Sequence, residues 1–164
     1  MATDRENVTG FGMLAGGGAA PPRNHRVALC IGNDLYSGSD RLPNCVADAR
    51  DMGQLARGMQ FDHVTVLVDV MRGEIVKQVR RLRDTVIQPG SIVLFYFSGH
   101  GAEHDGVTYL LPLGMDSHAD DDLEDEAVSL NYVLKVLNNQ TDTVNLLLLD
   151  CCRANDLDPT FKVS

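Results

Sequence analysis

The sequence predicts an α/β fold in which a mostly parallel sheet carries helices on both faces. Five short apolar runs alternate with segments whose apolar residues recur at helical spacing. Two of these runs, 92–97 and 144–149, are apolar at almost every position, which is typical of strands covered on both faces. Strands that alternate with helices are joined by right-handed crossovers, and such crossovers build a parallel sheet.

The compact part of the chain is expected to begin near residue 25. The residues before it, 1–24, include a stretch rich in Gly, Ala and Pro that supplies no packed face and predicts a flexible tail. An apolar run over 27–31 predicts the first strand. Apolar residues at near-helical spacing over 46–59 predict the first helix, and the next apolar run, 64–68, predicts the second strand.

The alternation continues through the middle of the chain. Apolar residues at positions i, i+4, i+7 and i+11 predict a second helix over 75–86, which Pro89-Gly90 ends just before the strand at 92–97. The run 107–111 follows that strand after a short loop. We therefore expect it to form one arm of a small antiparallel hairpin.

The last helix and strand precede a short C-terminal segment. Apolar residues at i, i+3, i+4 and i+7 predict a helix over 130–137, with Ser129 as its N-cap. The fifth strand is expected at 144–149. The final residues, 157–164, are interpreted as a linker stub.

The composition narrows the class of protein. Fourteen Lys and Arg residues against 23 Asp and Glu residues give a formal net charge of −9, whereas a nucleic-acid binder normally shows a basic face. No apolar run approaches the length of a membrane span, and the N-terminus lacks the apolar core of a signal peptide. We therefore expect a cytoplasmic, reducing location. Four cysteines in 164 residues do not form a disulfide framework.

Two of the predicted strands end in residues suited to covalent catalysis. Ser-Gly-His-Gly spans 98–101, and Asp-Cys-Cys-Arg spans 150–153. Because function collects at the carboxyl ends of strands in open α/β sheets, His100 and Cys152 would face one another if their strands are neighbours. A cysteine nucleophile needs a nearby imidazole to manage the proton. The N–H groups of Gly101 and Cys152 are candidates for the oxyanion hole.

These motifs resemble the caspase-fold cysteine peptidases, and further stretches resemble the paracaspase branch of that group. His100 precedes Cys152 by 152 − 100 = 52 residues, close to the caspase spacing of about 50. The branch resemblance rests on 31–36, 130–135 and 149–156. The resemblance implies a three-layer caspase-like fold, a p20-like catalytic domain over about 25–156 and a cysteine-type endopeptidase without a cofactor. It also implies that His100 and Cys152 are the catalytic dyad.

The resemblance further implies cleavage after Arg or Lys. In the branches with this specificity an Asp lies two residues before the nucleophile, as Asp150 does here, and a second Asp lies at the start of the first helix, as Asp48 does. Two converging carboxylates would suit the donor fork of a guanidinium. For Asp48, complementing the helix dipole is an alternative role. Arg41 lies in the loop where a caspase holds its Asp-binding arginine, so cleavage after Asp is the alternative specificity.

An acidic run precedes the last predicted helix. It includes Asp116, Asp121 and Asp122, and metacaspases place calcium-binding aspartates in a comparable region. Calcium is therefore an open option, although the spacing is not that of an EF-hand. The other readings are a solvated loop and a surface that attracts basic substrates by its field.

Other classes of function fit less well. The loop after the first strand lacks the glycine pattern of nucleotide-binding folds, and His100 and His104 lie on a glycine-containing loop rather than on a helix as in His-Glu-x-x-His zinc sites. A caspase-like protein without activity, acting as a regulator or interaction module, remains an alternative. Cys152 lies only 164 − 152 = 12 residues from the C-terminus, so we expect a p10-like small-subunit segment or a dimer partner to complete the catalytic unit.

Overall fold

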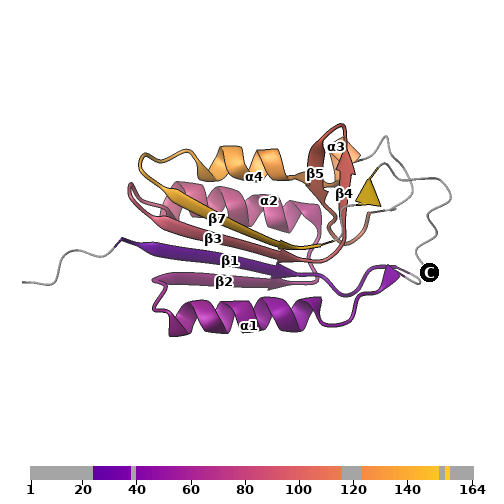
Figure 1. Ribbon diagram of the computed structural model, residues 1–164, viewed down its shortest axis with the longest axis horizontal. Helices are drawn as coiled ribbons and strands as arrows, with labels where there is room; N and C mark the ends of the chain where they lie inside the picture. The colour runs from indigo at the N-terminus through magenta and orange to yellow at the C-terminus, as the bar shows by residue number, and fades with distance from the viewer. Residues whose placement is uncertain (1–23, 38–39, 116–122, 152–153, 156–164) are drawn as a thin grey trace, which may run out of the picture.

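The computed structural model describes residues 24–37, 40–115, 123–151 and 154–155. Its main sheet has four strands in the order β2-β1-β3-β7, and all three strand pairs are parallel (Figure 1). Their bounds are β1 Arg26–Gly32, β2 His63–Val68, β3 Ile92–Ser98 and β7 Val144–Asp150. The predicted parallel sheet is confirmed, and each of its predicted strands lies within one residue of the observed bounds.

Helices cover both faces of this sheet, which gives the predicted three layers. Helix α1, Cys45–Gly58, packs against β1, β2 and β3 on one face. Helices α2, Arg72–Arg81, and α4, Leu130–Leu137, cover the other face (Figure 1). Among the helices of the described residues, none combines the length and the hydropathy of a membrane-spanning segment.

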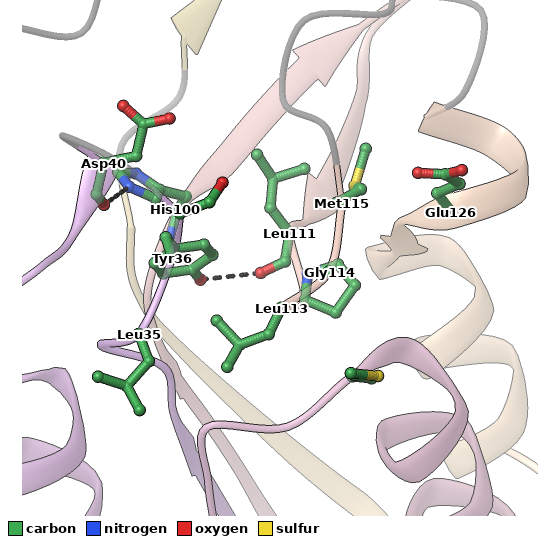
Figure 2. Close-up of a pocket in the computed structure, with 12 residues that line it drawn as sticks. Leu35, Tyr36, Asp40, His100, Leu111, Leu113, Gly114, Met115 and Glu126 are labelled. Atoms are coloured by element: carbon green, nitrogen blue, oxygen red, sulfur yellow. Dashed lines mark hydrogen bonds between the residues drawn. The ribbon is translucent and has the colours of Figure 1, made fainter.

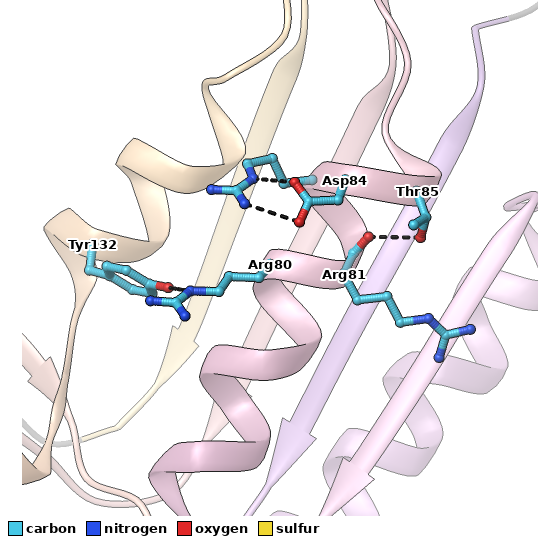
Figure 3. Close-up of polar contacts among 6 residues, drawn as sticks. Arg80, Arg81, Asp84, Thr85 and Tyr132 are labelled. Carbon is cyan, nitrogen blue, oxygen red and sulfur yellow. Dashed lines mark hydrogen bonds and ion pairs between the residues drawn. The ribbon is translucent and has the colours of Figure 1, made fainter.

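The predicted helix over 75–86 is found at the expected position, but it is not a regular α-helix along its whole length. Helix α2 gives way to a π-helical turn, η2, at Leu82–Val86, and the chain becomes extended at Ile87 before Pro89. The predicted cap of α4 is confirmed, because the Tyr132 N–H donates to the Ser129 hydroxyl over 3.2 Å. Arg80 also donates from Nε to the Tyr132 hydroxyl at 2.9 Å, which ties α2 to α4 (Figure 3).

A second, smaller sheet lies beyond the carboxyl end of the main one. Its strand order is β6-β5-β4-β8, with bounds β4 Gly101–His104, β5 Val107–Leu110, β6 Val128–Ser129 and β8 Ala154–Asn155. The predicted hairpin arm is confirmed as β5, which pairs antiparallel with β4. Asp105 and Gly106 turn between them with φ values of 50° and 73°, the positive φ pair that a tight hairpin needs. A short helix, α3 at Leu123–Glu126, precedes β6.

Strand β7 differs from β3 in how it is covered. In β3 the residues from Val93 to Ser98 are all buried, as the sequence predicts. In β7 every second residue is exposed, and Val144, Leu146 and Leu148 are 51%, 49% and 47% exposed. The expectation of cover on both faces is therefore wrong for β7. Among the described residues β7 is an edge strand, and α1 does not cover it. Only the face that carries Leu147 and Leu149 packs against the core beneath α2 and α4.

The thiol of Cys30 makes the stability of the main sheet sensitive to alkaline pH. Cys30 is fully buried in β1, and burial raises its pKa from 9.0 to about 11. Between these values the unfolded chain releases a proton that the folded chain keeps, so stability falls as pH rises. We expect a loss of up to ~2 kcal/mol from pH 8 to pH 11 that Cys30→Ala does not show. Urea unfolding of both proteins at each pH measures it, and equal slopes against pH would contradict the assignment.

Candidate active site

His100 lies in the turn between β3 and β4, with its ring half-buried at the carboxyl edge of the main sheet. Its Nε2 lies 2.6 Å from the backbone oxygen of Asp40, in the loop that leads from β1 to α1. A carbonyl oxygen only accepts hydrogen bonds, so Nε2 carries the proton and Nδ1 keeps its lone pair. The loop therefore fixes His100 in the tautomer in which Nδ1 is the basic nitrogen.

Tyr36 holds the backbone and the ring of His100. The Tyr36 hydroxyl accepts from the His100 N–H at 3.0 Å and donates to the Leu111 oxygen at 2.8 Å (Figure 2). The two rings meet edge to face with centroids 4.4 Å apart. Burial raises the pKa of Tyr36, which keeps the hydroxyl protonated and able to donate. A Cβ on Gly99 would lie 2.5 Å from this hydroxyl, so glycine is required there by close approach.

Removing the Tyr36 hydroxyl is expected to loosen His100. Tyr36→Phe leaves the partly buried His100 N–H and Leu111 carbonyl without the Tyr36 hydroxyl, which costs ~1–3 kcal/mol in the free energy of unfolding. We also expect a fall of about tenfold in the rate of any His100-dependent reaction. Tyr132→Phe is the matched control, because its hydroxyl bonds Arg80 on α2, away from the site. The Tyr132→Phe protein should lose stability but keep the rate of the His100-dependent reaction. Equal reactivity of Tyr36→Phe and the parent protein would exclude this positioning role.

The described residues on either side of the candidate nucleophile lie beside the residues on either side of His100. The N–H of Gly99 donates to the backbone oxygen of Asp150 at 3.3 Å, which fixes the end of β7 against the end of β3. Beyond it, Ala154 pairs with Ala102, so β8 lies parallel to β4. Cys152 itself lies outside the described residues. The described residues on both sides of it are nevertheless held next to both sides of His100.

Asp48 and Asp150 both act on Cys45, at the N-terminal end of α1. Burial raises the pKa of Cys45, the first residue of α1, and nearby carboxylates that include Asp48 and Asp150 raise it further. The pKa of Tyr96 is raised by burial first and then by Asp150 and Asp48. Both carboxylates therefore lie within electrostatic range of Cys45 and Tyr96. We call Asp48, Asp150 and Cys45 the acidic cluster.

Asp34 is a site residue that the sequence reasoning missed. Its Oδ1 accepts from the Val46 N–H at 3.0 Å, so it satisfies a free donor in the first turn of α1 from outside the helix. The Asp34 N–H in turn donates to Asp69 at 2.8 Å. Nearby, the fully buried side chain of Asn33 bonds both the N–H and the carbonyl of Val70. The signal available in the sequence was an acidic residue just after the first strand. The role of Asp34 is to hold the start of α1 beside the site, not to take part in the chemistry.

The remaining sequence-predicted residues divide between exposed and undescribed positions. Arg41 is exposed, directly after Asp40. Gly101 is buried at the start of β4. The calcium candidates Asp116, Asp121 and Asp122 lie outside the described residues, and within the described ranges no group of three His, Cys, Asp or Glu side chains could hold a metal ion.

Comparison with known proteins agrees with this architecture. The caspase domain family matches residues 25–164. The mucosa-associated lymphoid tissue lymphoma translocation protein 1 of Homo sapiens and its homolog in Mus musculus are each 27% identical over 144 residues, which is 87% of this chain. The chain spans only 17% of the length of these relatives.

A solved structure shares the fold. The crystal structure of protein GSU0716 from Geobacter sulfurreducens superposes with a TM-score of 0.58 at 20% identity, over 79% of this chain and 51% of that one. The caspase-like α/β fold expected from the motifs is thus confirmed, as is the resemblance to the paracaspase branch. The chain belongs to the caspase domain family.

Proposed function

We propose that the chain is the dyad-bearing part of a cysteine endopeptidase that cleaves after Arg or Lys, with His100 and Cys152 as its catalytic pair. One observation carries the proposal. The Asp40 carbonyl fixes Nε2 of His100, and the described residues that flank Cys152 run alongside the residues that flank His100. This arrangement suits a thiol and an imidazole that exchange one proton.

The proposed reaction is acyl transfer through a thioester. Nδ1 of His100 takes the proton from the Cys152 thiol, and the thiolate attacks the carbonyl carbon of the scissile bond. The N–H groups of Gly101 and Cys152 would stabilise the oxyanion. The carbon–nitrogen bond then breaks as His100 returns the proton to the departing amine. Water, deprotonated by the same imidazole, hydrolyses the thioester and frees the thiol.

The acidic cluster supports a basic residue before the scissile bond. Asp48 and Asp150 both raise the pKa of Cys45, which burial already raises, so both carboxylates lie within electrostatic range of this thiol. Two carboxylates at one site leave a negative charge that a guanidinium or ammonium would neutralise. The formal net charge of −9 adds a long-range attraction for basic peptides.

Fluorogenic peptides that differ only in the residue before the coumarin test this function. We expect hydrolysis of the Arg peptide and none of the Asp peptide. Cys152→Ala should abolish the reaction, and Cys151→Ala, the adjacent cysteine, is the matched control that should retain it. Hydrolysis of the Asp peptide in preference to the Arg peptide would favour the alternative specificity through Arg41. A chain that binds partners but cleaves neither peptide, alone or with an added p10-like segment, would favour a regulatory module.

The exposed row on β7 supports the expected p10-like segment as a partner. Val144, Leu146 and Leu148 present an apolar face about half exposed, and no described strand pairs with the outer edge of β7. Open apolar edges of this kind favour strand addition by another segment.

Adding a p10-like segment from a relative should therefore raise the activity, and Leu146→Lys should weaken its binding at least tenfold. Burial of one Leu side chain is worth about 1.5–3 kcal/mol, and titration calorimetry measures the change. Leu55→Lys, on the exposed face of α1, is the control (Leu55 is 57% exposed). Binding that Leu146→Lys leaves unchanged would place the partner elsewhere, and self-association instead would identify a second copy as the occupant.

A further inference from the structure

A cavity of about 540 Å³ lies beside His100, and the dyad alone does not account for it (Figure 2). Its lining comes from the loop after β1, from Met71 just before α2, from His100, from the segment 111–115 that follows β5, and from Glu126 at the end of α3. Leu113 and Met71, which both line the cavity, form an isolated β-bridge. Because Met71 is the residue just before α2, the cavity lies at the α2 side of the sheet, whereas the acidic cluster lies on the α1 side.

The lining is apolar with an acidic rim. Six apolar side chains contribute to it, namely Leu35, Met71, Leu111, Pro112, Leu113 and Met115. Leu35 and Met71 are 52% and 66% exposed, an unusual exposure for apolar side chains of this size. Glu126 faces the space from the far side (Figure 2), and the described lining contains no Lys or Arg. An apolar group fits this lining, and a carboxylate does not.

The position of the cavity relative to His100 indicates which part of a substrate would reach it. In cysteine peptidase chemistry the imidazole delivers a proton to the departing amine, so the residues after the scissile bond must pass the imidazole. His100 contributes to the cavity wall. A substrate with its basic residue in the acidic cluster would cross the sheet edge at His100 and enter the cavity with the residues that follow.

We propose that this cavity is a subsite for the leaving fragment, and that it selects peptides with a large apolar side chain just after the scissile bond. This inference rests on the proposed function. The volume of the cavity is within the range of small-ligand sites, ~300–1,000 Å³. Met71 and Leu113 are the specificity-determining residues, and Glu126 disfavours an acidic side chain at the same position.

Cleavage of matched peptides tests the selection. Internally quenched peptides with Arg before the bond and Leu, Ala or Asp after it should be cleaved in the order Leu, Ala, Asp. We expect a difference of at least tenfold in kcat/KM between Leu and Asp, as burial of one such side chain implies. Met71→Gln should lower that ratio, whereas Met59→Gln should not, because Met59 is a methionine of similar exposure at the C-terminal end of α1 (54% against 66%). An unchanged ratio in Met71→Gln would overturn the assignment of Met71.

Methionine-methyl NMR gives a readout that does not need turnover. The peptide Leu-Ser-Lys-amide, a leaving fragment, should shift the Met71 and Met115 methyl signals saturably and leave Met52 and Met59 in place. The matched peptide Asp-Ser-Lys-amide should shift none of them. Equal shifts with both peptides, or none with either, would overturn the subsite while an active Arg-coumarin assay leaves the proposed function standing. Shifts without any Arg-specific cleavage would overturn the proposed function and retain the cavity as a peptide-binding site.

Discussion

Replacing His100 by alanine is expected to lower the rate of covalent labelling by an Arg-acyloxymethylketone by about 10²–10⁴-fold, the usual contribution of general acid–base catalysis. The imidazole is the proton acceptor for the thiol in the proposed reaction, and Asp40 fixes its tautomer. The measurement is the second-order rate constant from intact mass against time. The fold should be retained, because the His100 side chain is only half-buried.

His104→Ala is the matched control for this prediction. His104 lies four residues further along, in β4, and its Nε2 is 3.6 Å from Asp105 at the tip of the hairpin. Its removal should leave labelling unchanged. A His104→Ala protein as slow as His100→Ala would indicate that the hairpin as a whole, rather than one imidazole, governs the reaction.

Neutralising the acidic cluster is expected to remove the preference for Arg. Each of Asp48→Asn and Asp150→Asn should lower labelling by the Arg probe by about 10–100-fold, since a hydrogen bond to a charged group is worth ~1.5–3 kcal/mol. A norleucine probe of similar length should be affected little. Because both carboxylates act on the same two groups, Cys45 and Tyr96, their effects should not be additive.

Asp51→Asn controls for charge alone. Asp51 lies on an exposed turn of α1, three residues beyond Asp48. Its replacement by Asn changes the net charge by the same amount as Asp48→Asn. It should preserve the ratio of Arg to norleucine labelling. If all three variants lose this ratio equally, the long-range field and not the acidic cluster would set the specificity.

The main sheet was predictable because its signal is strong and repeated. Burial selects apolar residues, so a buried strand such as β3 appears in the sequence as an apolar run. A helix buried on one face, such as α2, appears as apolar residues at i, i+4 spacing. Strand β7 shows the limit of that reasoning. Its leucines fit either a doubly covered strand or an edge strand that awaits a partner, and only the position of α1 separates the two.

The parts that sequence could not predict depend on short or backbone-mediated contacts. Strands β6 and β8 have two residues each, too few for a periodic pattern, so the second sheet was missed except for β5. The group that orients His100 is a backbone carbonyl, at Asp40, and a carbonyl is present at every position. Tyr36 was noted only as part of a motif, because its contacts come from residues 64 and 75 positions away.

The central claim is that His100 and Cys152 act together on a substrate with a basic residue before the scissile bond. Peptide mapping by mass spectrometry after treatment with the Arg-acyloxymethylketone tests it most directly. We predict one adduct per chain, on Cys152, absent from both Cys152→Ala and His100→Ala over the same time. An adduct on Cys151 or Cys45, or equal labelling of Cys152 with and without His100, would contradict the account.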